Sequence, residues 1–191
     1  ARLVPGSTLL MDLHITNGDA AVFLGAEPRF SIVDALENTH RLDEAFFKNV
    51  IVKTKAGVDL LASSERMMTS PLDVRRIRTL LDMAERHYRY VILDTPRSEA
   101  AILDALEGVR QIVLVANQEL ATVRSASRMA ATLRQRHGKD KLTVVMSRAE
   151  NGASNIYAHD LRTRRASRLT SSQAIDTSPS YSPDGSKIVF N

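Results

Sequence analysis

The 191-residue sequence contains no cysteine, so the fold has neither disulfide bonds nor a thiolate metal site. It also lacks a long hydrophobic run: no segment approaches the roughly 20 apolar residues that a membrane-spanning helix needs. No signal peptide is visible either. Hydrophobic residues still make up 43% of the chain, enough for a buried core, and we expect a cytoplasmic globular protein.

Charge of one sign is not concentrated in a single block. The formal net charge is +4, and several Arg residues stand beside acidic ones, as in residues 73–78 (DVRRIR), which is typical of solvated helix faces. The densest basic cluster lies at residues 162–168 and has only Tyr157 nearby as a stacking partner. We therefore do not expect nucleic-acid binding.

Apolar segments alternate with segments of helical periodicity along most of the chain. Strands are predicted at 8–13, 58–61, 90–93, 111–116 and 142–146, with a further short candidate at 50–52. Helices are predicted at 31–38, 42–49, 98–106 and 120–137. Continuously apolar strands that alternate with helices predict an α/β fold with a mostly parallel sheet covered on both faces.

Two helix boundaries carry specific signals. Ser70-Pro71-Leu72-Asp73 predicts a helix start, with Ser70 accepting from the free N–H groups and Pro71 in the first turn. Apolar residues then repeat at helical spacing as far as Ala84. Gly138 is predicted to stop the helix at 120–137.

Three polar residues stand at the ends of predicted apolar strands: Asp12, Asp94 and Asn117. Ligands of open parallel sheets bind beyond the carboxyl ends of the strands, where a carboxylate can hold Mg²⁺ directly or through water. An Asp in such a place can equally cap the following turn. From the pattern alone, both roles of Asp12 and Asp94 stay open.

The periodicity changes after Asn151-Gly152. Residues 156–161 alternate with period two, residues 166–170 follow a turn, and residues 182–186 (SPDGS) lead into a short apolar strand at 187–190. We therefore divide the chain into a tag-like or irregular lead-in at residues 1–7, an α/β domain at 8–150 and a β-hairpin or blade-like segment at 151–191.

Residues 9–14 (LLMDLH), followed by Asn17-Gly18-Asp19, resemble the second strand and switch region of the MinD/ParA-type ATPases. Residues 91–96 (VILDTP) are similar to that family's Walker B strand, and residues 116–119 (ANQE), followed by residues 123–126 (VRSA), resemble its next strand and helix. Residues 144–148 (VVMSR) stand where the family approaches adenine. The likeness covers about residues 8–150 and extends to the CpaE/TadZ branch, which helps position Flp-type pilus assembly at the inner membrane.

The resemblance implies a P-loop type of fold that binds ATP and Mg²⁺, with Asp12 and Asp94 on the metal. The nucleotide-binding residues that it implies are Asp12, Asp94, Asn117, Ser147 and Arg148. It further implies a homodimer, pilus or secretion machinery as partners, and a place in the cytoplasm or at the periphery of the inner membrane.

The chain departs from this family at three places. The family's glycine-rich phosphate loop and its Lys, expected before Thr8, do not stand in these 191 residues. His14 stands where the family commonly has a second Asp, and Ser147 where it often has Asn. The fold implied is thus a MinD/ParA-type sheet truncated at its N-terminus, whose central strand position is left to be filled.

Residues 152–191 resemble one blade of a TolB-type β-propeller, through residues 155–161 (NIYAHDL), 167–170 (SRLT) and 177–190. A propeller needs several blades to close its ring, so a single blade does not imply the propeller's partners. A chimera of two fragments accounts for both resemblances. As an alternative, the strand at 187–190 fills the central position of the sheet.

Three functions follow from these patterns. The first is a CpaE/TadZ-like positioning domain that acts as a non-catalytic or weakly nucleotide-binding scaffold. The second is an Mg-ATP-dependent ATPase whose phosphate loop is supplied elsewhere. The third is a TolB-like protein-interaction module carried by residues 152–191.

Overall fold

A computed structural model describes residues 6–97, 100–117, 119–150, 153–160, 165–168, 180–181 and 188–189. The chain forms two compact units, divided between Leu106 and Glu107, and each is described by itself. Within the described ranges, no helix combines the length and the apolar character needed to cross a bilayer.

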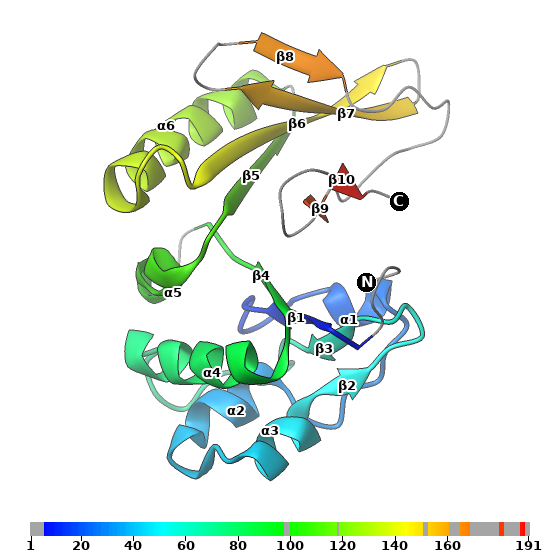
Figure 1. The fold of residues 1–191 in the computed structure, drawn as a ribbon, viewed down its shortest axis with the longest axis vertical. Coiled ribbons are helices and arrows are strands. Elements are labelled where there is room, and N and C mark those ends of the chain that lie inside the picture. The colour runs from blue at the N-terminus through cyan, green and yellow to red at the C-terminus, as the bar shows by residue number, and fades with distance from the viewer. Residues whose placement is uncertain are drawn as a thin grey trace. The chain divides into compact units, whose positions relative to one another are not determined.

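The first unit is built on a four-stranded sheet in the order β2-β3-β1-β4 (Figure 1). β1 (Thr8–Asp12) lies between β3 (Asp59–Leu61) and β4 (Tyr90–Asp94) and is parallel to both. β2 (Val52–Lys53) pairs antiparallel with β3. The strands predicted at 8–13, 58–61 and 90–93 are confirmed, whereas the candidate at 50–52 begins inside the end of α3 (Glu44–Val50).

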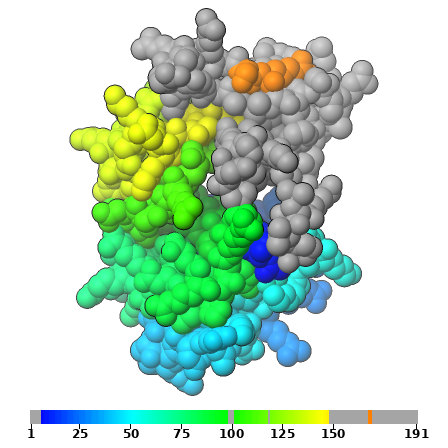
Figure 2. Space-filling view, in the orientation of Figure 1, coloured from blue at the N-terminus to red at the C-terminus, as the bar shows by residue number. Residues whose placement is uncertain are grey.

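Helices pack on both faces of this sheet because successive strand side chains point to opposite sides. Leu9 and Met11 of β1 belong to a large core shared with α2 (Ile32–Glu37), α3, α4 (Val74–His87) and α5 (Ala100–Ala105). Leu10 contacts a smaller cluster that includes Ala20 of α1 (Ala20–Phe23). In the space-filling view, the light-blue atoms of α2 and α3 and the green atoms of α4 form one continuous surface (Figure 2).

α4 begins three residues later than the sequence predicts. Its N-cap is Asp73, whose carboxylate accepts a hydrogen bond from the Arg75 backbone N–H at 2.8 Å. Ser70 does not cap the helix, because its hydroxyl accepts from the Arg76 guanidinium at 2.9 Å instead. The predicted apolar face is confirmed, with Ile77, Leu80 and Ala84 buried.

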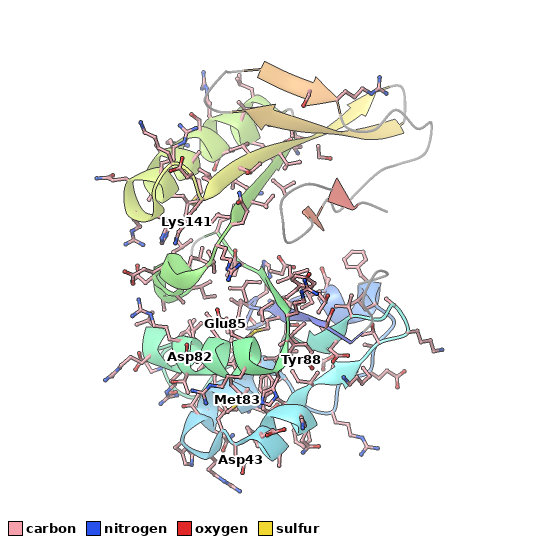
Figure 3. All side chains as sticks on the ribbon, viewed as in Figure 1. Asp43, Asp82, Met83, Glu85, Tyr88 and Lys141 are labelled. Atoms are coloured by element: carbon pink, nitrogen blue, oxygen red, sulfur yellow. The ribbon has the colours of Figure 1, made fainter. Side chains whose placement is uncertain are left out.

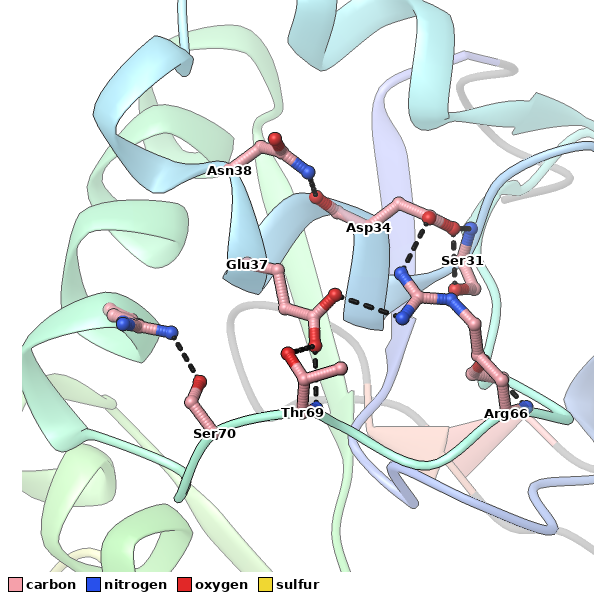
Figure 4. A network of polar contacts seen from close by, with 9 residues as sticks. Ser31, Asp34, Glu37, Asn38, Arg66, Thr69 and Ser70 are labelled. Carbon is pink, nitrogen blue, oxygen red and sulfur yellow. Dashed lines mark hydrogen bonds and ion pairs between the residues drawn. The ribbon is translucent and has the colours of Figure 1, made fainter.

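A polar network holds the loop after β3 against α2 (Figure 4). The Arg66 guanidinium donates to the carboxylates of Asp34 and Glu37, each at 2.8 Å. The backbone N–H and the hydroxyl of Thr69 both donate to Glu37 at 2.7 Å. These hydrogen bonds, that of the Thr69 backbone first, lower the pKa of Glu37 to about 2. The network fixes the segment that leads from β3 to α4 against α2, which is followed by the 3₁₀-helix η1 (Thr39–Arg41).

The second unit contains a sheet in the order β5-β6-β7-β8. β5 (Ile112–Asn117) and β6 (Leu142–Glu150) are parallel and are joined by α6 (Leu120–His137), while η2 (Leu106–Gly108) precedes β5. α6 has the predicted bounds and ends at Gly138, whose φ of 91° favours glycine. The predicted α/β fold is confirmed.

β7 (Ala153–Asp160) and β8 (Arg165–Arg168) continue this sheet as antiparallel strands. β6 is longer than the predicted strand at 142–146, because β7 pairs with it as far as Glu150. The division of the chain after Glu150 stays a prediction. Most of residues 161–191, and residues 1–5 of the lead-in, lie outside the described residues.

The last strands form a pair of their own. β9 (Ser180–Tyr181) and β10 (Ile188–Val189) are antiparallel partners in a two-stranded sheet. For the part of residues 187–190 that the structure describes, the prediction that this strand fills the central position of the larger sheet is therefore wrong. Pairing with β9, a partner close in sequence, satisfies part of the β10 backbone locally.

Candidate functional site

Two carboxylates meet at the C-terminal ends of β1 and β4. Asp12 and Asp94 are the last residues of these parallel strands and are direct register partners. His14 lies beside them, so that ligand atoms of all three side chains lie within 4.8 Å of one another. The structure thus brings together the two Asp residues that the sequence predicts and adds an imidazole.

Asp12 is fully buried, with an exposed fraction of 0%. Its Oδ1 accepts a hydrogen bond from the His14 backbone N–H at 3.1 Å, and its Oδ2 accepts from the Ala20 N–H at 3.3 Å. Burying a carboxylate is costly unless its oxygens are hydrogen-bonded, and these donors meet that need. Asp12 therefore ties the end of β1 to the first residue of α1.

Gly18 lies directly against the Asp12 carboxylate. A Cβ at this position would fall 2.2 Å from Asp12 Oδ2 and 2.5 Å from Oδ1. The Ser63 hydroxyl donates to the Gly18 carbonyl at 2.8 Å, and Asn17 before it has a φ of 66°. The Asn17-Gly18 pair indicates a turn in the sequence, but nothing in the pattern shows that this turn closes over Asp12.

His14 links the two carboxylates. Its Nδ1 lies 3.1 Å from Asp12 Oδ1 and 4.0 Å from Asp94 Oδ1. The side chain of Asp94 is 56% exposed and that of His14 is 35% exposed. The cluster is therefore anchored in the core by Asp12 and opens to solvent at Asp94.

The pKa of the Asp94 carboxyl is raised above its ordinary value. Partial burial is the main cause, because it disfavours the charged form. His14 lowers the pKa, the neighbouring Asp12 carboxylate raises it, and the Thr95 backbone N–H lowers it, with a net upward shift. Asp94 consequently holds its proton more strongly than an isolated Asp does.

The other predicted site residues lie in the second unit. Asn117, the last residue of β5, and Ser147, within β6, are register partners. The Asn117 side-chain carbonyl accepts from the Glu119 N–H at 3.2 Å, capping the turn into α6. Arg148 follows on β6, and its side chain lies outside the described part. A role for these three residues in nucleotide binding stays a prediction.

The residues at the ends of β1 and β4 fit a divalent cation. Carboxylate oxygens are the ligands that Mg²⁺ prefers, and Asp94 is exposed enough to contact the ion or its water. These residues offer fewer binding groups for the phosphates of a nucleotide, because the glycine-rich loop and the Lys that would contact the phosphates do not stand in these 191 residues. The cluster thus fits the cation part of a nucleotide site.

The chain is similar in sequence to known proteins. The chain is 25% identical over 129 residues to the putative septum site-determining protein MinD of Oltmannsiellopsis viridis, and 27% identical over 128 residues to that of Chlorella vulgaris. Each match covers 65% of this chain, but only 40% and 44% of those relatives, so the chain spans less than half their length. No family model matches the chain.

Solved structures show the same fold. The ParA family ATPase from Chlorobium tepidum TLS matches with a TM-score of 0.63 and 20% identity, covering 75% of this chain and 62% of that one. MinD in the MinC:MinD cell division complex of Aquifex aeolicus matches with a TM-score of 0.61 and 22% identity, covering 76% and 57%.

These relatives and neighbours support a relationship to the MinD/ParA-type ATPases, and the predicted P-loop type of α/β fold is confirmed. The CpaE/TadZ branch and the TolB-like blade are finer predictions that these comparisons do not reach.

Proposed function

We propose that this chain provides the cation-binding half of a MinD/ParA-type nucleotide site and that these 191 residues act as a weakly nucleotide-binding, non-catalytic scaffold. One observation carries the proposal: Asp12 and Asp94 end adjacent parallel strands as direct partners, within reach of one ion. In open parallel sheets, this is the edge at which ligands bind.

The two carboxylates would have different tasks. Asp94 is the exposed member and would contact Mg²⁺ or a water bound to it. Asp12 is buried, and it holds the turn through Gly18 and the start of α1 by accepting from backbone N–H groups. When bound, Mg²⁺ neutralises phosphate charge and orients the phosphates. A ligand bound at Asp94 would thus affect the position of α1 through Asp12.

Weak binding is expected because the strongest phosphate contacts of such sites come from the missing loop. Its backbone N–H groups and its Lys would neutralise and position the phosphates. The alternative of an active Mg-ATP-dependent ATPase requires that another segment or chain supply this loop. Nucleotide affinity distinguishes the scaffold from the active ATPase, since a site with a phosphate loop binds nucleotide far more tightly than the cation-binding residues alone.

The biological role that we propose is that of a CpaE/TadZ-like positioning factor, with protein partners and a second copy of the chain. Support for this comes from the resemblance of residues 9–14 and 91–96. The neighbour of known structure from Aquifex aeolicus was solved as a MinC:MinD complex, which favours a protein partner here as well.

Calorimetric titration of the chain with Mg-ATP, beside ATP without Mg²⁺, tests the proposal. We expect weak binding that depends on Mg²⁺ and is lost in Asp94→Ala. Asp82→Ala is the matched control, because Asp82 is an exposed Asp on α4 (Figure 3) and should leave binding unchanged. Equal Mg-ATP affinity in Asp94→Ala and the wild type would refute a role for Asp94 in binding. Tight binding accompanied by ATP hydrolysis would favour the active ATPase.

A further inference from the structure

We infer that Asp12, His14 and Asp94 form a binding site for a late first-row divalent cation such as Zn²⁺ or Co²⁺. The ion binds to this site without nucleotide. The inference rests on the proposed function in one respect, since both place a cation between Asp12 and Asp94. It goes further in making His14 a ligand, which changes the identity of the metal.

The spacing of the donor atoms fits a shared ion. Metal–nitrogen and metal–oxygen bonds of such ions measure about 2.0–2.2 Å, so two donors on one ion lie roughly 3–4 Å apart. His14 Nδ1 and Asp12 Oδ1 are 3.1 Å apart, and His14 Nδ1 and Asp94 Oδ1 are 4.0 Å apart. An ion would replace the hydrogen between His14 and Asp12, and the exposed Asp94 side chain would close the third bond.

The donors are held in place before any ion binds. Asp12 is fixed by the N–H groups of His14 and Ala20 and is backed by Gly18, which leaves no room for a side chain. Ligands oriented by such surrounding contacts bind metals more tightly than free side chains do. Because Asp94 and His14 are partly exposed, water can reach the ion and fill its remaining positions.

Charge also favours a cation at this point. Asp12 and Asp94 place two carboxylates side by side, and among the described residues the only ion-pair partner recorded for either is His14. A divalent ion between the two carboxylates would balance their charge.

The imidazole decides which metal is favoured. Mg²⁺ takes oxygen ligands almost alone, whereas imidazole nitrogen suits Zn²⁺ and the other late first-row ions, whose affinities also rise along that row. A set of two carboxylates and one His with open positions is therefore better matched to Co²⁺ or Zn²⁺ than to Mg²⁺. A second Asp in place of His14 would narrow this preference.

The test uses the whole chain without nucleotide, titrated with CoCl₂ by visible absorption and with ZnCl₂ and MgCl₂ by calorimetry. We expect one site that prefers Zn²⁺ and Co²⁺ to Mg²⁺ by at least about tenfold. His14→Asn should lower Zn²⁺ and Co²⁺ affinity at least about tenfold. His40→Asn is the matched control, since His40 is an exposed His in η1, outside the cluster.

His14→Asp provides a second variant that keeps a ligand at this position. It should narrow the preference for Zn²⁺ over Mg²⁺ while the chain stays folded. Absence of Zn²⁺ and Co²⁺ binding, or equal affinity in His14→Asn and the wild type, would overturn the inference. If Mg-ATP still bound in an Asp94-dependent way, the proposed function would survive that failure. Metal binding without any binding of Mg-ATP would leave the inference intact and remove the proposed function.

Discussion

At the scale of single residues, Asp12 and Gly18 act as one unit. The carboxylate is fully buried and accepts from two backbone N–H groups, and the glycine lies against it without space for a methyl group. The position of Asp12 relative to Asp94 and His14 depends on this contact. A change at Gly18 should therefore damage the cluster without altering any of its ligands.

We predict that Gly18→Ala destabilises the chain by about 3 kcal/mol, because the new Cβ overlaps the Asp12 carboxylate and the turn must shift. Gly108→Ala is the control, since no heavy atom lies within 4 Å of a Cβ there, and we expect a change within about 0.5 kcal/mol. Urea unfolding of both variants measures the difference. Equal stability of the two variants would mean that Gly18 is not held against Asp12.

Glu37 gives a pH dependence whose sign can be stated. Its pKa is lowered from the model-peptide value of 4.5 to about 2 by hydrogen bonds from Thr69 and Arg66. A depressed pKa means that Glu37 stabilises the fold above its unfolded pKa and that this contribution is lost as pH falls from about 4.5 to about 2. Asp34, whose pKa is also lowered, loses its contacts in the same direction.

In Arg66→Ala, we predict that the Glu37 pKa rises but stays below its ordinary value, because Thr69 still donates to the carboxylate. Stability should then fall less steeply between about pH 4.5 and 2 than in the wild type. NMR titration of Glu37, together with unfolding at several pH values, measures both effects. An unchanged Glu37 pKa would show that Arg66 does not contribute to the shift.

At the scale of helices and strands, local chemistry decides where α4 begins. Ser70 and Asp73 are both residue types that cap helices, and Pro71 favours a first helical turn, so the sequence predicts the earlier start. The structure selects Asp73, because the Ser70 hydroxyl is engaged by the Arg76 guanidinium. Of the two side chains that precede α4 and could cap it, only Asp73 accepts a hydrogen bond from the backbone of the first turn.

We predict that Asp73→Ala costs about 1 kcal/mol of stability, which is typical of a lost N-cap. Ser70→Ala should cost less than about 0.5 kcal/mol, since it removes one part-buried side-chain hydrogen bond outside the helix. Denaturant midpoints of the two variants compare them directly. A larger loss in Ser70→Ala than in Asp73→Ala would place the cap at Ser70.

The elements that the sequence predicts best are those with a strong local pattern. The strand at 8–13 and the helix at 120–137 are continuous in apolar spacing, and both appear with nearly the predicted bounds. β6 is longer than predicted because its last residues pair with β7, which is a non-local partner that periodicity cannot show. β10, by contrast, pairs with β9, a partner close in sequence.

The candidate site likewise contains residues that the local sequence pattern predicts and one that it does not. Asp12 and Asp94 could be predicted, because both end apolar strands and parallel strands align their carboxyl ends. The contribution of His14 could not, since it depends on the chain turning back after β1. That turn is fixed by contacts with distant residues: Leu13 N–H to the Asp94 carbonyl at 2.8 Å and Ser64 N–H to the Ile15 carbonyl at 3.2 Å.

At the scale of the whole molecule, each unit has a sheet that ends on an apolar strand. β4 is paired on one side only by β1, and β5 on one side only by β6, within the described residues. Ile92 of β4 and Val115 of β5 are 39% and 43% exposed. In the MinD/ParA-type family that the sequence resembles, the strand with the phosphate loop lies at the centre of the sheet. Each edge strand thus leaves an apolar side chain accessible within its own unit.

The central claim is that a divalent cation binds between the ends of β1 and β4. Amide NMR spectra with substoichiometric Mn²⁺, which broadens signals near the ion, test it most directly. We predict selective broadening at Leu13, His14, Gly18 and Thr95, which surround Asp12 and Asp94, and its loss in Asp94→Ala. Broadening centred on exposed carboxylates elsewhere, such as Asp82 and Glu85 of α4, would contradict the claim.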